Sequence, residues 1–198
     1  MKIIFASNNE NKAGEIRHAL AHGVEIVTLK EAGITIDIPE PYETLEENAR
    51  EKSTVIHQLT GMNCFSEDTG LEVDALHGAP GVRSARYAGS GKSFEKNMDK
   101  LLKEMADKTD RAARFRTIIS LILDGHETLF EGTCEGHISR ERRGNSGFGY
   151  DPIFIPLGSE KTFGEMSLAE KQRFSHRARA VEKLVIFLNS WVSEPEAK

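Results

Sequence analysis

Two long runs rich in β-branched and aromatic residues, joined by a single Asp-Gly pair, constrain the fold of this chain more than any other feature. The runs are Arg114–Leu123 and Thr128–Ile138, and the pair is Asp124-Gly125. Because Asp and Gly tolerate the positive φ angles of a tight turn, the runs are predicted to pair as an antiparallel hairpin. We expect strands of this length to project as a curved arm.

The rest of the chain alternates short apolar runs with stretches of helical periodicity. Lys2–Ala6 predicts a strand, and the apolar spacing after it predicts a helix through about His22. Thr44 and Glu47 have the spacing of a capping box, which predicts the start of a helix that ends near Leu59. Further elements are predicted as strands at Val24–Thr28, Asn63–Phe65, Leu71–Ala75 and Pro152–Ile155, and as helices from Ser93 to Ala106 and after Ser175.

An acidic segment, Ser66–Gly70 (SEDTG), is predicted to be a turn between two short strands. Its adjacent carboxylates, Glu67 and Asp68, are costly to ionise together unless a cation or a water-filled cleft absorbs their charge. An upstream acid such as Glu40 or Glu43 offers a further oxygen ligand, so a site for a hard cation such as Mg²⁺ is one interpretation. An ordinary solvated turn is the other.

Three more segments have residue types that suit a phosphate, a base or a ligand carbonyl. Ser7–Lys12 (SNNENK) lies between a strand and a helix, where free backbone N–H groups and the helix dipole favour a phosphate. Phe148–Asp151 offers aromatic faces for stacking on a base, and Ser175–Arg177 with Lys171 offers hydrogen-bond donors. Each segment also has a plainer interpretation, namely a polar turn, core packing or a helix cap with surface cations.

The segment Gly89–Ser93 (GSGKS) ends like a phosphate-binding P-loop but does not satisfy that motif. The position that requires the first glycine is Arg86, and the preceding stretch from Gly78 to Tyr87 is predicted to be a loop instead of a buried strand. We therefore do not assign a P-loop here.

Charge and hydropathy exclude several classes of protein. The 198 residues include 26 basic and 31 acidic side chains, and this net charge of −5 argues against a nucleic-acid partner. No apolar run approaches the roughly 20 residues that span a bilayer, and the N-terminus lacks an export pattern, so we expect a cytoplasmic protein with no membrane partner.

One domain over residues 1–198 is expected, with Ser193–Lys198 as a frayed tail. Cys64 and Cys134 are expected to be buried as small apolar residues.

Ordered motifs from Lys2 to about Leu188 resemble one family, the inosine/xanthosine triphosphate pyrophosphatases, which clear deaminated purine nucleotides. The motifs are SNNENK, ETLEENAREK, SEDTGLEVDALHGAPGVRSARYAG, GFGYDPIF, KTFGEM and SHRARA. The chain departs from the family pattern at three places, which are Ser7-Asn8-Asn9 for Thr-Gly-Asn, Glu67-Asp68 for a double aspartate, and Thr69 for serine.

The resemblance implies an α/β fold with an elongated mixed β-sheet flanked by helices, two lobes with a central substrate cleft, and a homodimer. It implies that Asp68 is the catalytic base, that Glu40 and Asp68 hold Mg²⁺, and that Glu67 is a candidate second carboxylate. The residues implied to bind the nucleoside triphosphate are Ser7, Asn8, Asn9, Glu10, Asn11, Lys12, Lys52, Thr69, Phe148, Gly149, Tyr150, Asp151, Lys171, His176 and Arg177.

The activity implied by the resemblance is Mg²⁺-dependent hydrolysis of ITP, dITP and XTP to the monophosphate and pyrophosphate, with water attacking the α-phosphorus. Two alternatives stay open. One is a related pyrophosphatase for modified pyrimidine or ordinary nucleotides, which would differ in the pocket between Phe148 and Arg177. The other is a nucleotide-binding regulator that has lost catalysis.

Overall fold

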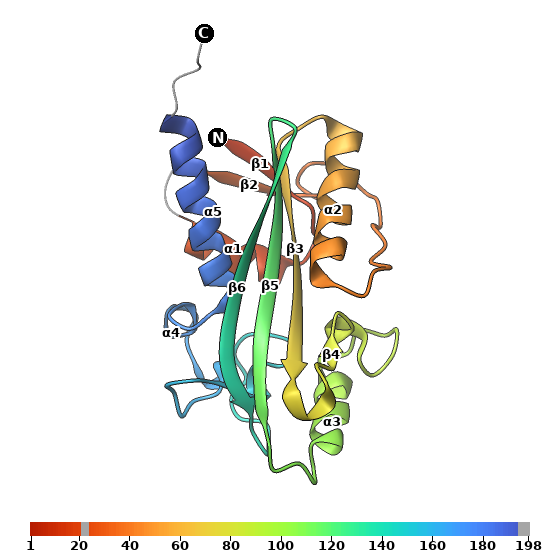
Figure 1. Cartoon of the computed structure of the whole chain (residues 1–198), viewed down its shortest axis with the longest axis vertical. Helices are drawn as coiled ribbons and strands as arrows, with labels where there is room; N and C mark the ends of the chain where they lie inside the picture. Colours follow the sequence, from red (N-terminus) through yellow and green to blue (C-terminus); the bar gives the residue numbers. More distant parts are fainter. Residues whose placement is uncertain (21–23, 194–198) are drawn as a thin grey trace.

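The computed structural model describes residues 1–20 and 24–193, and within them seven strands form one mixed sheet. The sheet order is β2-β1-β3-β5-β6-β7, with β4 paired to β3 (Figure 1). The strands are β1 Lys2–Phe5, β2 Glu25–Thr28, β3 Cys64–Val73, β4 Pro80–Gly81, β5 Ala112–Leu123, β6 His126–Ile138 and β7 Phe154–Pro156. The helices are α1 Glu10–Ala19, α2 Leu45–Thr60, α3 Phe94–Glu104, α4 Leu168–Gln172 and α5 His176–Ser193. Strands β2, β1 and β3 are parallel, whereas every other pairing is antiparallel.

The predicted hairpin of β5 and β6 is confirmed. Asp124 and Gly125 have φ angles of 49° and 80°, and pairing extends from Leu123 opposite His126 to Ala112 opposite His137. The predicted projecting arm is wrong, because the other edge of β5 is paired with β3 along the whole of β3. The long strands instead run down the middle of the molecule, parallel to its longest axis (Figure 1).

The predicted acidic turn at Ser66–Gly70 is also wrong, because this segment lies inside β3. All ten residues of β3 pair with β5, so ladder hydrogen bonds outweigh the local turn preference of Asp-Thr-Gly. Gly70 serves a different purpose, since a Cβ at this position would lie 2.7 Å from the backbone oxygen of Gly81 in β4. The glycine permits a close approach of two strands.

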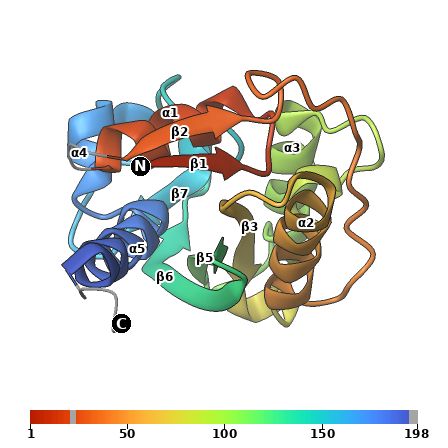
Figure 2. The same cartoon turned by 90° about the horizontal axis from the view of Figure 1, so that it is seen from above.

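Helices cover both faces of the long strands. Figure 2 shows α2 and α5 on opposite sides of them. Helix α2 packs on β3 and β5, whereas α5 packs on β5, β6 and α1. On α5, Val181, Leu184 and Leu188 are buried against Phe5, Ile16 and other residues of β1, α1 and β3.

Local signals set most helix boundaries. Asn9 caps α1 and Thr44 caps α2, each by accepting a backbone N–H three residues later. Helix α1 ends at Ala19, short of the predicted end near His22, because Leu20 already has an extended backbone. Residues 21 and 22 of the predicted helix lie outside the described residues, as do residues 194–198 of the predicted tail.

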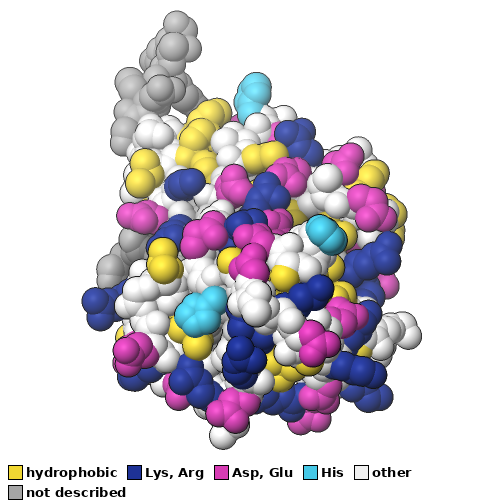
Figure 3. Space-filling view, turned by 60° about the horizontal axis from the view of Figure 1, so that its bottom comes forward, with side chains coloured by type: hydrophobic (Ala, Val, Ile, Leu, Met, Phe, Trp, Pro, Cys, Tyr) yellow, Lys and Arg dark blue, Asp and Glu magenta, His cyan; other side chains and the backbone are white. Residues whose placement is uncertain are grey.

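The cysteines and the charged surface agree with the composition. Cys64 and Cys134 are free and buried, as expected. Figure 3 shows basic and acidic side chains interspersed over the face it presents. No helix among the described residues is both long enough and apolar enough to cross a membrane.

Strand β6 lies directly against α5 because residue 132 is glycine. A Cβ at Gly132 would lie 2.0 Å from the backbone oxygen of His176 and 2.6 Å from the backbone nitrogen of Ala180. The start of α5 is therefore held at a depth that only glycine allows.

We expect Gly132→Ala to lower the free energy of unfolding by about 3 kcal/mol, because forcing extra atoms into a packed core costs roughly 1–3 kcal/mol or more. Gly14→Ala in α1 is the matched control, since nothing lies within 4 Å of its Cβ position. That variant should gain about 0.5–1 kcal/mol from reduced backbone entropy of the unfolded chain. Urea unfolding measures both, and a neutral Gly132→Ala would contradict the packing described.

Candidate active site

A cavity of about 510 Å³ collects residues from segments that are distant in the sequence. The residues of the sequence prediction that line it are Ser7, Asn8, Asn9, Lys12, Glu40, Lys52, Glu67, Asp68, Thr69, Phe148, Gly149, Tyr150, Asp151, Lys171, His176 and Arg177. Glu10 and Asn11 are not brought to its wall. Both are exposed, because the helical rotation that directs Lys12 inward directs them outward.

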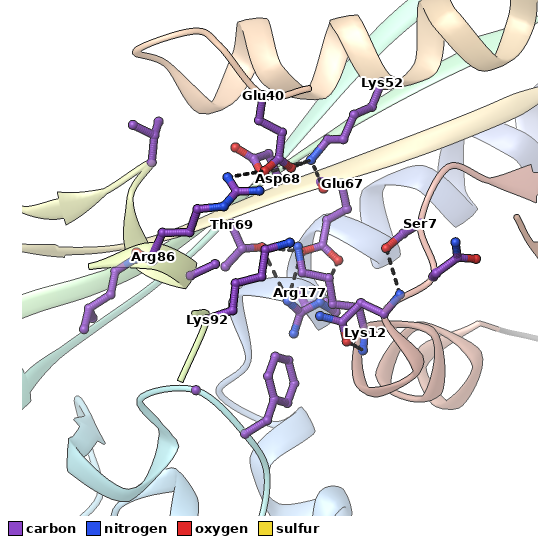
Figure 4. Close-up of a pocket in the computed structure, with 18 of the residues that line it drawn as sticks. Ser7, Lys12, Glu40, Lys52, Glu67, Asp68, Thr69, Arg86, Lys92 and Arg177 are labelled. Carbon is purple, nitrogen blue, oxygen red and sulfur yellow. Dashed lines mark hydrogen bonds and ion pairs between the residues drawn. The ribbon is translucent and has the colours of Figure 1, made fainter. Parts of the chain in front are cut away.

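The alternation of side chains along β3 separates the two central carboxylates. Glu67 contacts Arg177 of α5 through two hydrogen bonds of 2.8 and 2.9 Å, whereas Asp68 contacts Lys52 of α2 at 3.0 Å. Thr69 returns to the side of Glu67 and donates a hydrogen bond to it. A strand thus presents adjacent acids to two different helices (Figure 4).

Lys52 lies between the carboxylates of Glu40 and Asp68. Its Nζ lies 2.7 Å from Oε1 of Glu40 and 3.0 Å from Oδ1 of Asp68, and it donates to the backbone oxygen of Glu67 at 2.9 Å. Burial alone would lower the pKa of Lys52, but Asp68 and Glu40 more than compensate and raise it. Lys52 is therefore a buried cation shared by two acids.

The two adjacent acids have opposite pKa shifts. Burial raises the pKa of Asp68, and the charge of Glu40 adds to this rise against the opposing effect of Lys52 and Lys12. Burial acts in the same direction on Glu67, but Arg177 and Lys12 hold the pKa of Glu67 well below its usual value. Asp68 is accordingly the better proton acceptor of the two.

A buried ion-pair network lies beside these carboxylates. Arg177 donates to Glu15 as well as to Glu67, and Lys171 lies 2.5 Å from Glu15 and 2.6 Å from Asp151. Each of these five side chains is at most 7% exposed. The network therefore joins α1, β3 and α5 through charges that have little access to water.

The segment Phe148–Asp151 and the start of α5 also line the cavity. Tyr150 is buried and its hydroxyl donates to the backbone oxygen of Ser84 at 2.8 Å, whereas Asp151 accepts from the backbone N–H of Phe148 at 2.9 Å. His176 stacks on Phe115 with ring centroids 4.7 Å apart.

His176 carries an unused polar atom. Within residues 1–20 and 24–193, its Nδ1 is the one buried side-chain nitrogen or oxygen without a hydrogen-bond partner. Burial and then the charges of Arg177 and Lys171 hold the pKa of His176 well below its usual value, so the ring is neutral. Such an atom offers a hydrogen bond to a bound molecule.

The strand-to-helix segment at Ser7–Lys12 contributes Ser7, Asn8, Asn9 and Lys12 to the cavity wall. Asn9 accepts from the backbone N–H of Lys12 at 3.1 Å, and Ser7 accepts from that of Asn9 at 3.1 Å. Lys12 Nζ lies 3.3 Å from Glu67. Its charge therefore faces the cavity close to the carboxylates.

Sequence reasoning missed several residues of this region. The cavity is also lined by Arg86, Lys92, Phe94 and Phe115. Glu15 does not line it but forms ion pairs with Lys171 and Arg177, which do. The GSGKS segment drew attention to Lys92, but only as part of a P-loop motif that the chain does not contain. Glu15 gives no local signal, because a glutamate in an amphipathic helix ordinarily faces water.

Comparisons with known proteins identify the family of this chain. The model of the Ham1 family matches residues 3–187. A protein of Porphyromonas gingivalis named dITP/XTP pyrophosphatase is 50% identical over 188 residues, covering 94% of this chain and 97% of that protein. One of Christiangramia forsetii with the same name is 47% identical over 189 residues, covering 96% of this chain and all of that protein. The solved structure of the Staphylococcus aureus Ham1 protein matches with a TM-score of 0.87 and 38% identity over 96% of this chain and all of that one.

The fold and the cavity define an α/β protein in which a long mixed sheet carries acids and cations in one cleft. The chain belongs to the Ham1 family. This confirms the family and the α/β fold with a mixed sheet that the ordered motifs predict.

We expect Glu15→Gln to lower the free energy of unfolding by about 3 kcal/mol, because it removes from the buried network the carboxylate that Arg177 and Lys171 share. Glu10→Gln, on the exposed side of the same helix, is the matched control and should change it by less than about 1 kcal/mol. Urea unfolding at neutral pH compares the variants. Equal effects would show that the buried network does not stabilise the fold.

Proposed function

We propose that this chain is a nucleoside triphosphate pyrophosphatase that hydrolyses the deaminated purine nucleotides ITP, dITP and XTP to the monophosphate and pyrophosphate. The observation that carries the proposal is the Lys52 cluster, in which one lysine joins Glu40 and Asp68 on the wall of a cavity that also contains Lys12. The relatives named dITP/XTP pyrophosphatase, which match nearly the whole chain, support this substrate class. From the family resemblance we also propose that the enzyme is a single domain, forms a homodimer and is cytoplasmic.

Asp68 is the group that we assign as general base. Its raised pKa makes it a better proton acceptor than an ordinary carboxylate at neutral pH. A water molecule attacks the α-phosphorus and gives a proton to Asp68, while the bond from the α-phosphorus to the bridging oxygen breaks and pyrophosphate leaves. Lys12 and Lys52 offset the charge that develops on the phosphate oxygens.

The residues present fit Mg²⁺. Glu40 and Asp68 offer the oxygen donors that this ion prefers, and as like charges sharing one lysine they suit a divalent cation. Few carboxylates suffice, because Mg²⁺ usually completes its shell with water and substrate phosphates. When bound there, Mg²⁺ supplies positive charge to the phosphate oxygens.

Base selection is assigned to the region from Phe148 to Arg177. The guanidinium of Arg177 is engaged by Glu67 and Glu15, so the unpartnered Nδ1 of His176 is the better donor to the 6-oxo group of hypoxanthine or xanthine. Adenine has an amino donor at that position, and sites that leave buried polar groups unpaired reject such analogues by about 10⁴- to 10⁵-fold. Guanine keeps the 6-oxo group, so its exclusion is assigned to crowding around its 2-amino group.

The test is pyrophosphate release from ITP, dITP, XTP, GTP and ATP in the presence of Mg²⁺. We expect ITP, dITP and XTP to exceed ATP and GTP by about 10³-fold or more in kcat/KM. Asp68→Asn should lower kcat by at least about 10³-fold, since it removes the base, whereas Asp107→Asn at an exposed position should match the wild type.

Other results would favour the alternatives. Equal hydrolysis of ATP and GTP would show that the pocket selects ordinary nucleotides. Tight nucleotide binding without pyrophosphate release would indicate a regulator that has lost catalysis.

A further inference from the structure

The glycine-rich segment before α3 reaches the cavity even though it is not a P-loop. Arg86, which occupies the place of the first P-loop glycine, ends a 3₁₀ turn of residues Ser84–Arg86, and α3 begins at Phe94. Between them, Lys92 is part of the cavity wall. In Figure 4 its side chain extends into the cavity from the side of Arg86 toward Thr69 and Lys12.

Lys92 has a backbone conformation that lysine rarely adopts. Its φ is 47°, in the left-handed region, and Gly89 earlier in the same segment has a φ of 126°. Side chains with a Cβ are uncommon in this region, and the exceptions concentrate at ligand-binding positions. Here the conformation turns the segment at the rim of the cavity, immediately before Ser93 caps α3.

The charge of Lys92 is uncompensated, unlike that of every other cation in the wall. The paired cations are Lys12 with Glu67, Lys52 with Glu40 and Asp68, Arg86 with Glu40, Lys171 with Glu15 and Asp151, and Arg177 with Glu15 and Glu67. Over the described ranges, Lys92 forms no ion pair, and it is exposed. It is therefore the lysine whose full charge is available to an anionic ligand.

We propose that Lys92 is a substrate-binding residue that pairs with non-bridging oxygens of the polyphosphate chain of the nucleotide. This inference rests on the proposed function for its substrate. The other cavity cations must share their charge with protein carboxylates, whereas Lys92 brings a charge that no carboxylate of the described chain offsets.

The kinetic test compares Lys92→Gln with Lys96→Gln, which removes the same charge four residues later on the exposed surface of α3. Lys92→Gln should raise the KM for dITP about tenfold with kcat within about twofold, because a charge-assisted hydrogen bond to the substrate is lost. Lys92→Arg should restore most of the affinity, and Lys96→Gln should match the wild type. Equal KM values for Lys92→Gln and Lys96→Gln would overturn the inference while leaving the proposed function intact.

A binding test separates this inference from the proposed function. Calorimetry with inorganic triphosphate should show affinity about tenfold weaker for Lys92→Gln and unchanged for Lys96→Gln. This result would support Lys92 as a polyphosphate ligand even if the wild type hydrolysed no nucleotide, which would refute only the proposed function. Unchanged affinity in Lys92→Gln, or no binding of triphosphate by the wild type, would overturn the inference. Far-UV circular dichroism checks that each variant is folded.

Discussion

The site depends on one constraint, which is the burial of two adjacent carboxylates inside a strand that is paired along its whole length. Because β3 is fixed against β5, Glu67 and Asp68 cannot turn out toward water. A buried charge is stable only when it is paired and hydrogen-bonded. Cations from opposite faces of the sheet meet this need, Lys52 from α2 and Arg177 from α5. Their ion pairs also hold the two helices to the sheet.

The same arrangement gives neighbouring acids different chemical characters. Glu67 is saturated by Arg177, Lys12 and Thr69, so it remains ionised and acts as an anchor. Burial raises the pKa of Asp68, and the nearby charge of Glu40, with which Asp68 shares Lys52, adds to this rise. Strand geometry makes this division possible, since consecutive side chains point to opposite faces and so meet different partners.

Glycines determine how closely the layers approach around the cavity. At Gly70 the neighbour is the backbone of β4, and at Gly132 it is the first turn of α5. Gly132 therefore sets the depth at which His176 and Arg177 enter the structure. In both places the residue is glycine because a Cβ has no room, and neither lies in a tight turn.

Features that depend on neighbouring residues are predictable from the local pattern of the chain. The hairpin turn at Asp124-Gly125 and the helix cap at Thr44 are short-range interactions, and the order of the motifs identified the family. Other features depend on contacts between distant parts of the chain. Tertiary structure converted Ser66–Gly70 from an apparent turn into the middle of a strand, because pairing with β5 outweighs local preference. The burial of Glu15 in an ion-pair network also depends on tertiary structure. Its partners Lys171 and Arg177 are 156 and 162 positions away, and no local pattern encodes such contacts.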